Sequence, residues 1–289
     1  MSFMTRLQDP HPLLMVELRP PRRNLSAQHS MDSWIDLNHT VRRLIEEDVQ
    51  ILLTDNAVGE SEEESLFHLM ANLGSDADPE RIIPMLTCKH AVDYCLRFPV
   101  RAAQQGHRSL VVLGGDRHDG VPRCTEHAFL LRRDIRRLQP ALSLGGWANP
   151  HADPVRQVEY LLADEVSADF YLTQVVSHYD LRRLDAFLEE ASRRGLNLPG
   201  VFGVFFYRSA NLRTLKALQP FFPVPAEELQ RDLAPDGPGP EQVCADTIVA
   251  LRQRGIQRVY VSNLHPDRAA HRLARIRALL ENRVSPPGR

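Results

Sequence analysis

The 289-residue chain has few of the features that mark the more specialised classes of protein. It contains four cysteines, Cys88, Cys95, Cys124 and Cys244, and no two of them form a CxxC pair. Neither a disulfide framework nor a structural zinc site is therefore expected. No apolar run approaches the roughly 20 residues that span a bilayer, and the first residues lack the long apolar core of a secretory signal. We expect reduced thiols and a cytoplasmic protein that does not interact with membranes.

Patterns that would identify a nucleic-acid, metal or dinucleotide site are also missing. The formal net charge is only −2, so the chain offers no basic field for nucleic acid, although all but two of its cations are arginine. The 12 histidines include no HExxH or other compact ligand spacing, so we predict no metal. The glycines of LVVLGGDRHDG do not form GxGxxG, and a Rossmann fold is not predicted.

What the sequence does have is a regular alternation of short apolar runs and longer amphipathic runs. Runs that are apolar almost throughout are typical of parallel strands buried on both faces, and apolar residues at three- and four-residue steps are typical of helices. The expected strands are 13–18, 49–54, 81–87, 109–113, 141–144, 170–173, 201–206 and 258–261. The expected helices are 33–47, 62–73, 91–105, 125–138, 154–166, 181–194 and 240–254.

Eight such units predict an α/β fold, a single (β/α)8 TIM barrel over residues 13–283. An open doubly wound sheet would give the same alternation, but polar residues follow all eight apolar runs, which favours closure. The Pro- and Gly-containing segment 221–241 is expected to be an insertion, and residues 1–12 and 284–289 are expected to be loose tails.

In a barrel of this kind, the residues that follow the strands surround one pocket at the C-terminal face. We therefore take the polar and glycine residues at these positions as candidate site residues. They are Glu17; Thr54, Asp55 and Asn56; Thr87, Cys88, Lys89 and His90; Gly114, Gly115 and Asp116; Trp147, Asn149 and His151; Gln174 and His178; Tyr207 and Arg208; and Ser262, Asn263 and His265.

Three of these positions suggest chemistry, each with a simpler alternative. Glu17 ends a strand in VELRPPR, where partial desolvation could raise its pKa and make it a general acid, or Arg19 could simply pair with it. Asp116 could bind a ligand or cap the next helix. Lys89 could form a Schiff base or hold a phosphate, but an exposed rim cation is the simpler interpretation.

Aromatic residues near strand seven could stack on a planar heterocycle, although some must alternate into the core. They are Phe202, Phe205, Phe206 and Tyr207.

Six segments, in order along the chain, resemble motifs of the methylenetetrahydrofolate reductase family. VELRPPR resembles the family's FEFFPP-type first strand with its catalytic glutamate, and LGGD is similar to its LRGD. The other four are LLTDNA, similar to VTYGA; PMLTC, similar to HLTC; ADFYLTQ, similar to a segment running into ITQ; and LPGVFGV, similar to IPGILPV.

The resemblance implies a TIM barrel that reduces 5,10-methylenetetrahydrofolate to 5-methyltetrahydrofolate with NAD(P)H and FAD. Glu17 would protonate the folate, and Asp116 would stabilise the developing cation. The substrate would contact Gln174 and Phe202. Residues near the cofactor would be Thr54, Gly115, Trp147 and His151.

The sequence departs from the family where FAD should bind. The family's cationic LKRK-like stretch is EYLLA here, at residues 159–163, and its histidine before LTC is Met85. FAD would then be held by other residues such as Arg156, Arg117 and His151, or hydride would pass directly from the nicotinamide. Alternatively, the chain is a folate- or corrinoid-pathway accessory subunit that depends on a partner. A homo-oligomer is a further possibility.

Overall fold

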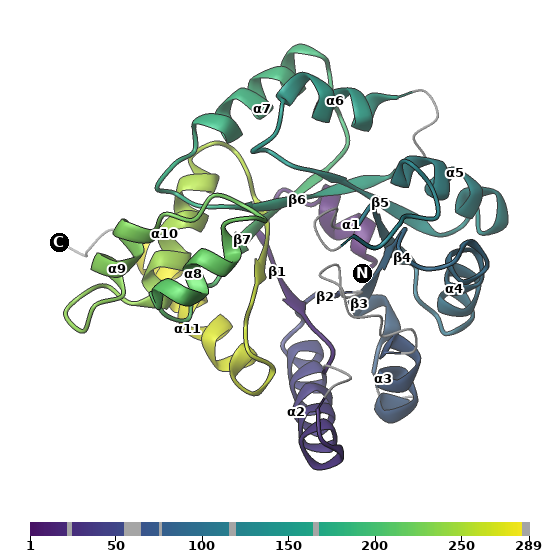
Figure 1. Cartoon of the computed structure of the whole chain (residues 1–289), viewed down its shortest axis with the longest axis horizontal. Helices are drawn as coiled ribbons and strands as arrows, with labels where there is room; N and C mark the ends of the chain where they lie inside the picture. The colour runs from purple at the N-terminus through teal and green to yellow at the C-terminus, as the bar shows by residue number, and fades with distance from the viewer. Residues whose placement is uncertain (22–24, 55–64, 75–76, 116–119, 164–167, 285–289) are drawn as a thin grey trace.

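The computed structural model describes residues 1–21, 25–54, 65–74, 77–115, 120–163 and 168–284. Its eight parallel strands close into a barrel in the order of the sequence, β1 pairing with both β2 and β8 (Figure 1). The strands are β1 (Leu13–Leu18), β2 (Ile51–Leu53), β3 (Ile82–Thr87), β4 (Ser109–Leu113), β5 (Ser143–Ala148), β6 (Phe170–Val176), β7 (Gly200–Phe205) and β8 (Arg258–Ser262). The predicted (β/α)8 TIM barrel is confirmed.

At least one helix follows each strand, and these helices cover the outside of the barrel (Figure 1). They are α2 (Ala27–Glu46), α3 (Ser65–Leu73), α4 (Val92–Gln104), α5 (Ala128–Leu138), α6 (Pro154–Leu162), α7 (Arg182–Arg193), α10 (Pro240–Arg252) and α11 (Ala269–Val284). Short 3₁₀ turns η2 (Pro79–Arg81) and η3 (Pro266–Arg268) precede β3 and α11.

The strand residues divide into two hydrophobic layers because successive side chains point to opposite faces. The inner layer fills the barrel, as expected for a packed core of this fold, and includes Met15, Leu52, Phe170, Val201 and Tyr260. The outer layer lies between the strands and the helices. This division assigns each residue at a strand end to the barrel interior or to the helix side.

A short N-terminal helix, α1 (Phe3–Gln8), packs against the inner layer of the barrel. Phe3 and Leu7 are 2% and 0% exposed, and the ring of Phe3 meets that of Phe170 edge-on at 5.0 Å. Residues 1–12 are therefore not the loose tail expected from the sequence, because two apolar side chains of α1 are buried in the barrel. At the other end, α11 extends to Val284, and residues 285–289 lie outside the described part.

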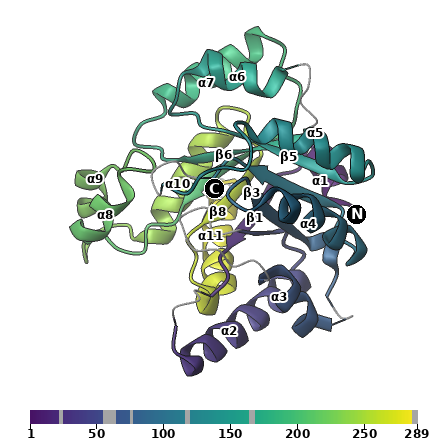
Figure 2. The same ribbon diagram turned by 45° about the vertical axis from the view of Figure 1, so that its right-hand side comes forward.

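The long connection between β7 and α10 forms two additional helices, α8 (Leu212–Leu218) and α9 (Ala226–Asp232). Both views place them together beside α10 (Figures 1 and 2). Phe222 and Leu229 from this connection share a separate hydrophobic cluster with Val175 and Tyr207. The predicted insertion at 221–241 thus begins later than the structural one, which already includes α8.

Strand β5 differs most from the sequence prediction, which ended it at residue 144. Gly145 and Gly146 resemble a turn in the sequence, yet both lie within the strand. A Cβ atom on Gly145 would come within 2.6 Å of the Phe170 ring. The glycine therefore makes room for a large interior side chain, and Trp147 lies within the strand rather than after it.

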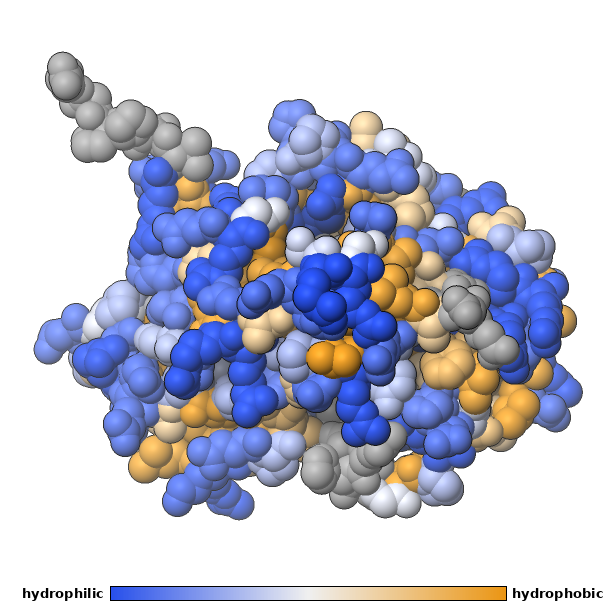
Figure 3. All heavy atoms as spheres, turned by 90° about the horizontal axis from the view of Figure 1, so that it is seen from above, coloured by the Kyte–Doolittle hydropathy of each residue, from blue (hydrophilic) through white to orange (hydrophobic). Residues whose placement is uncertain are grey.

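The face shown in Figure 3 is mostly polar, with scattered hydrophobic areas. Among the described residues, no helix has the length and apolar character needed to cross a membrane.

Candidate functional site

The C-terminal mouth of the barrel brings Glu17 and Ser262 together. Met15 on β1 and Tyr260 on β8 belong to the inner layer, so Glu17 and Ser262, two residues further along each strand, also face the interior. The Oγ hydroxyl of Ser262 donates a hydrogen bond of 3.1 Å to Oε1 of Glu17. Two neighbouring strands therefore fix the carboxyl group at the mouth.

The environment of Glu17 shifts the pKa of its carboxyl group towards neutrality. Desolvation raises the pKa of Glu17 to about 7, against smaller lowering effects from the Ser262 hydrogen bond and the charge of Arg19. Near neutral pH, the carboxyl group is therefore present in both its protonated and its ionised form. The positive charge of Arg19 favours the ionised form of Glu17, but desolvation has the larger effect on its pKa.

Gln174 lies at an irregularity in the barrel. The register of β6 against β7 shifts between Leu172 and Val175, and such bulges redirect side chains near active sites. Oε1 of Gln174 accepts a hydrogen bond of 2.9 Å from the backbone of Val175, and Nε2 donates one of 3.3 Å to the carbonyl of Phe221. Among the described contacts, a second amide N–H and a second lone pair remain for a ligand.

Three of the predicted cofactor residues also reach the mouth. Thr54 is half-buried directly after β2, and its backbone N–H bonds the carbonyl of Leu18 at 3.0 Å. Trp147 is half-buried and packs against the inner layer. Gly115 adopts φ of +77°, and a Cβ there would lie 2.7 Å from Cε of Lys89. The aliphatic part of Lys89 therefore passes directly over this glycine.

The residues after β5 do not fit an FAD diphosphate. The ring of His151 is bonded through Nε2 to the carbonyl of Val175 at 2.8 Å, and desolvation lowers the pKa of His151, so the ring is neutral. The carboxylate of Asp153 accepts the backbone N–H of Arg156 at 2.8 Å, so an acid occupies the start of α6, where a phosphate would be favoured.

Further along α6, Glu159 pairs with Arg194 at 3.3 Å. All residues of α6 are described, and Arg156 is the one cation among them. Its side chain is exposed. Among the described residues from β5 to the end of α6, two phosphates would therefore lack the set of cationic and backbone partners they require; Arg117 lies outside the described residues.

Phe202 does not line the mouth. It is 4% exposed in the outer layer, and its ring lies 6.2 Å from that of Tyr171. Val201 is in the inner layer, so Phe202 must point to the helices. Phe205, on the interior side of the same strand, is half-buried and contacts the rings of Tyr207 and Phe222 at 5.0 and 5.1 Å. The alternation of the strand identifies Phe205 as the aromatic residue closest to the predicted role.

Asp116 lies outside the described residues, as do Asp55 and Asn56. The sequence interpretation gave Ser262 no specific role, and so it missed the contact of Ser262 with Glu17. The two-residue spacing between Tyr260 and Ser262 would have indicated that both side chains face the interior. In the described part of the chain, no group of three or more histidine, cysteine or acidic side chains could hold a metal ion.

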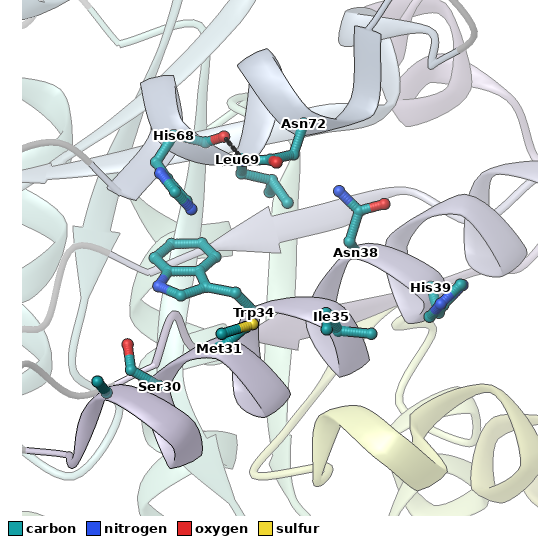
Figure 4. Close-up of a pocket in the computed structure, with 10 residues that line it drawn as sticks. Ser30, Met31, Trp34, Ile35, Asn38, His39, His68, Leu69 and Asn72 are labelled. Carbon is teal, nitrogen blue, oxygen red and sulfur yellow. Dashed lines mark hydrogen bonds between the residues drawn. The ribbon is translucent and has the colours of Figure 1, made fainter.

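A separate hollow of about 700 Å³ lies outside the barrel between α2 and α3. Trp34 and His68 face each other there with ring centroids 4.3 Å apart (Figure 4). Its lining shares no residue with the mouth of the barrel, so it does not belong to the candidate site.

No protein-family model and no curated protein matches this sequence. Among solved structures, an uncharacterized protein from Clostridium thermocellum that binds two copies of 5-methyl-5,6,7,8-tetrahydrofolic acid is similar with a TM-score of 0.69 and 15% identity. The match covers 96% of this chain and 99% of that one. PhdJ bound to a substrate intermediate is similar with a TM-score of 0.50 and 11% identity, over 98% of this chain and 75% of that one. These similarities establish the shared fold.

Proposed function

We propose that this protein is a methylenetetrahydrofolate reductase-like oxidoreductase that converts 5,10-methylenetetrahydrofolate to 5-methyltetrahydrofolate. The observation that carries the proposal is Glu17, a carboxyl group at the mouth of the barrel with a pKa of about 7. The ordered motifs that resemble the reductase family support it. The structurally similar clostridial protein binds 5-methyltetrahydrofolate, the product of the proposed reaction.

Glu17 would act as the general acid. Its proton passes to a nitrogen of the five-membered imidazolidine ring of the folate, the bond from that nitrogen to the methylene carbon breaks, and a 5-iminium cation forms. Hydride from NAD(P)H then adds to the iminium carbon to give the methyl group, and the oxidised nicotinamide leaves. A solvent proton restores Glu17. Proton transfer of this kind is efficient when the pKa of the acid lies near the working pH.

The neighbouring side chains have roles consistent with this chemistry. Ser262 holds the carboxyl group by its 3.1 Å hydrogen bond, and the ionised form of Glu17 would stabilise the iminium cation beside it. The half-buried rings of Trp147 and Phe205 would contact the flat pterin. The remaining hydrogen-bonding capacity of Gln174 suits the polar edge of the pterin.

The proposed hydride donor is NAD(P)H itself, without a flavin between donor and folate. The poor fit of His151, Asp153 and Glu159 to a diphosphate supports direct transfer. FAD held through Arg156 is the competing arrangement, and the absorption spectrum of the purified protein distinguishes the two. A yellow protein with flavin absorbance would favour FAD, whereas a colourless protein that oxidises the nicotinamide would favour direct transfer.

The test follows reduced nicotinamide by its absorbance, with and without methylenetetrahydrofolate, and identifies 5-methyltetrahydrofolate in the product. Glu17→Gln should abolish most of the turnover. Glu80→Gln is the matched control, because Glu80 lies in η2 before β3, at the opposite end of the barrel, and should retain full activity. Equal turnover by Glu17→Gln and the wild type would remove Glu17 from the mechanism.

The second candidate is a non-redox accessory subunit of a folate or corrinoid pathway, favoured by the poor fit of α6 to FAD. It predicts that calorimetry detects binding of 5-methyltetrahydrofolate while no nicotinamide is oxidised, with or without added FAD. A third possibility, carbonyl chemistry at Lys89, would be indicated by borohydride trapping of a covalent adduct on that residue.

A further inference from the structure

Three of the four cysteines gather beside the mouth of the barrel, although they are scattered in the sequence. Cys88 follows β3, Cys95 lies in the first turn of α4, and Cys124 lies in the segment between β4 and α5. The backbone N–H of Cys124 bonds the carbonyl of Cys88 at 2.6 Å, and the Sγ atoms of Cys124 and Cys95 are 3.8 Å apart. The fold thus holds two sulfur atoms in van der Waals contact.

The two sulfur atoms differ in exposure. Cys124 is half-buried, so a small oxidant can reach it from solvent, whereas Cys95 is completely buried directly behind it. This combination of an accessible sulfur and an adjacent second sulfur is the arrangement in which a thiol oxidised at the surface is converted to a disulfide.

Cys88 is a poorer partner for Cys124. It is completely buried, and desolvation and the nearby Cys124 raise the pKa of its thiol to about 12, despite the opposing charges of Arg123 and Arg132. Cys95 is equally buried, so the choice of Cys95 as the partner rests on the 3.8 Å contact between its Sγ atom and that of Cys124.

From this geometry we infer that Cys95 and Cys124 are an oxidation site that forms a reversible intramolecular disulfide. The thiol of Cys124 loses its proton and attacks a hydroperoxide, whose O–O bond breaks; the proton passes to the departing oxygen, which leaves as an alcohol or water, and Cys124 becomes a sulfenic acid. Cys95 then gives up its thiol proton and attacks this sulfur, the S–S bond forms, and the S–O bond breaks to release water, which carries that proton away. Two thiols are oxidised and one hydroperoxide is reduced. A dithiol reductant reverses the change.

The disulfide would tie the start of α4 to the segment after β4. Arg123, next to Cys124, bonds the carbonyl of Gly115 at the mouth, so the cross-link would be made beside the candidate site. This inference does not depend on the proposed function, since the disulfide forms or fails to form whatever the barrel binds.

The experiment treats the whole reduced protein with hydrogen peroxide, blocks remaining thiols with an alkylating reagent, and maps peptides by mass spectrometry without reduction. We expect one cross-linked peptide pair containing Cys95 and Cys124, with Cys88 and Cys244 alkylated after unfolding. Dithiothreitol should restore four reactive thiols. Oxidised protein should also melt at a higher temperature than reduced protein, because the cross-link restricts the unfolded chain.

Cys95→Ser and Cys124→Ser should each abolish the cross-link. Cys244→Ser is the matched control, because Cys244 is a buried cysteine of α10 that is 1% exposed, and this variant should form the disulfide as the wild type does. A cross-link to Cys88, a disulfide between two molecules, or four unmodified thiols after treatment would each overturn the inference. Mapping of the wild type decides the question even if a serine variant is poorly folded.

Discussion

Replacing Glu17 by glutamine should reduce activity and stabilise the protein at the same time. Glutamine keeps the size of the side chain and its contact with Ser262, but it cannot donate the proton. General acid catalysis contributes typically about 10²- to 10⁴-fold, so turnover should fall by a factor in that range. A loss of folding would also reduce activity, which is why the second measurement is needed.

The expected stabilisation follows from the pKa of Glu17. It rises from 4.5 to about 7 on folding, so the folded protein binds this proton more tightly than the unfolded chain. The penalty for burying the carboxyl group is absent below pH 4.5, grows as the pH rises, and is complete above pH 7. It reaches about 3 kcal/mol, at about 1.4 kcal/mol for each pKa unit.

The assay is urea unfolding of the wild type and Glu17→Gln at pH 5 and at pH 8, beside turnover at each pH. The free energy of unfolding of the variant minus that of the wild type should be larger at pH 8 than at pH 5. The increase should not exceed the full penalty. An equal difference at both pH values would refute the raised pKa. A variant that is as active as the wild type would refute the acid role, whatever its stability.

The remaining predictions test the mouth and the interior of the barrel. Ser262→Ala removes a hydrogen bond that lowers the pKa of the acid, so the fall of turnover with rising pH should move to higher pH. Phe170→Ala should lower the free energy of unfolding by about 3 to 5 kcal/mol in urea titrations, because its ring is completely buried against Phe3. Gly203→Ala should cost about 1 to 3 kcal/mol in the same titrations, since its Cβ would lie 2.6 Å from Oη of Tyr260.

The barrel was predictable because its signals are local. Short apolar runs alternating with amphipathic ones locate all eight strands, and β1 and β4 have the predicted bounds. The prediction for strand β5 ended too early because a glycine at position 145 is typical of a turn. The structure shows instead that Gly145 makes room for the ring of Phe170, which lies 25 residues further along the chain. The burial of α1 was missed for a similar reason, because nothing nearby in sequence indicates that Phe3 packs against Phe170.

The candidate site was predictable in part. The end of β1 indicated Glu17 as a rim carboxylate, but the choice between a general acid and an ion pair with Arg19 depended on desolvation, which only the three-dimensional structure gives. The helix-facing direction of Phe202 could have been found from the two-residue period of β7. The contact between Cys95 and Cys124 could not, because it depends on where Cys124 lies relative to α4 in three dimensions.

The position of α1 at one end of the barrel determines the side from which a ligand can bind. With Phe3 and Leu7 packed among the interior side chains, α1 closes the end of the barrel opposite Glu17. A ligand that contacts Glu17 must therefore bind from the C-terminal mouth of the barrel. An affinity tag joined to Met1 would therefore lie at the end of the barrel opposite the candidate site.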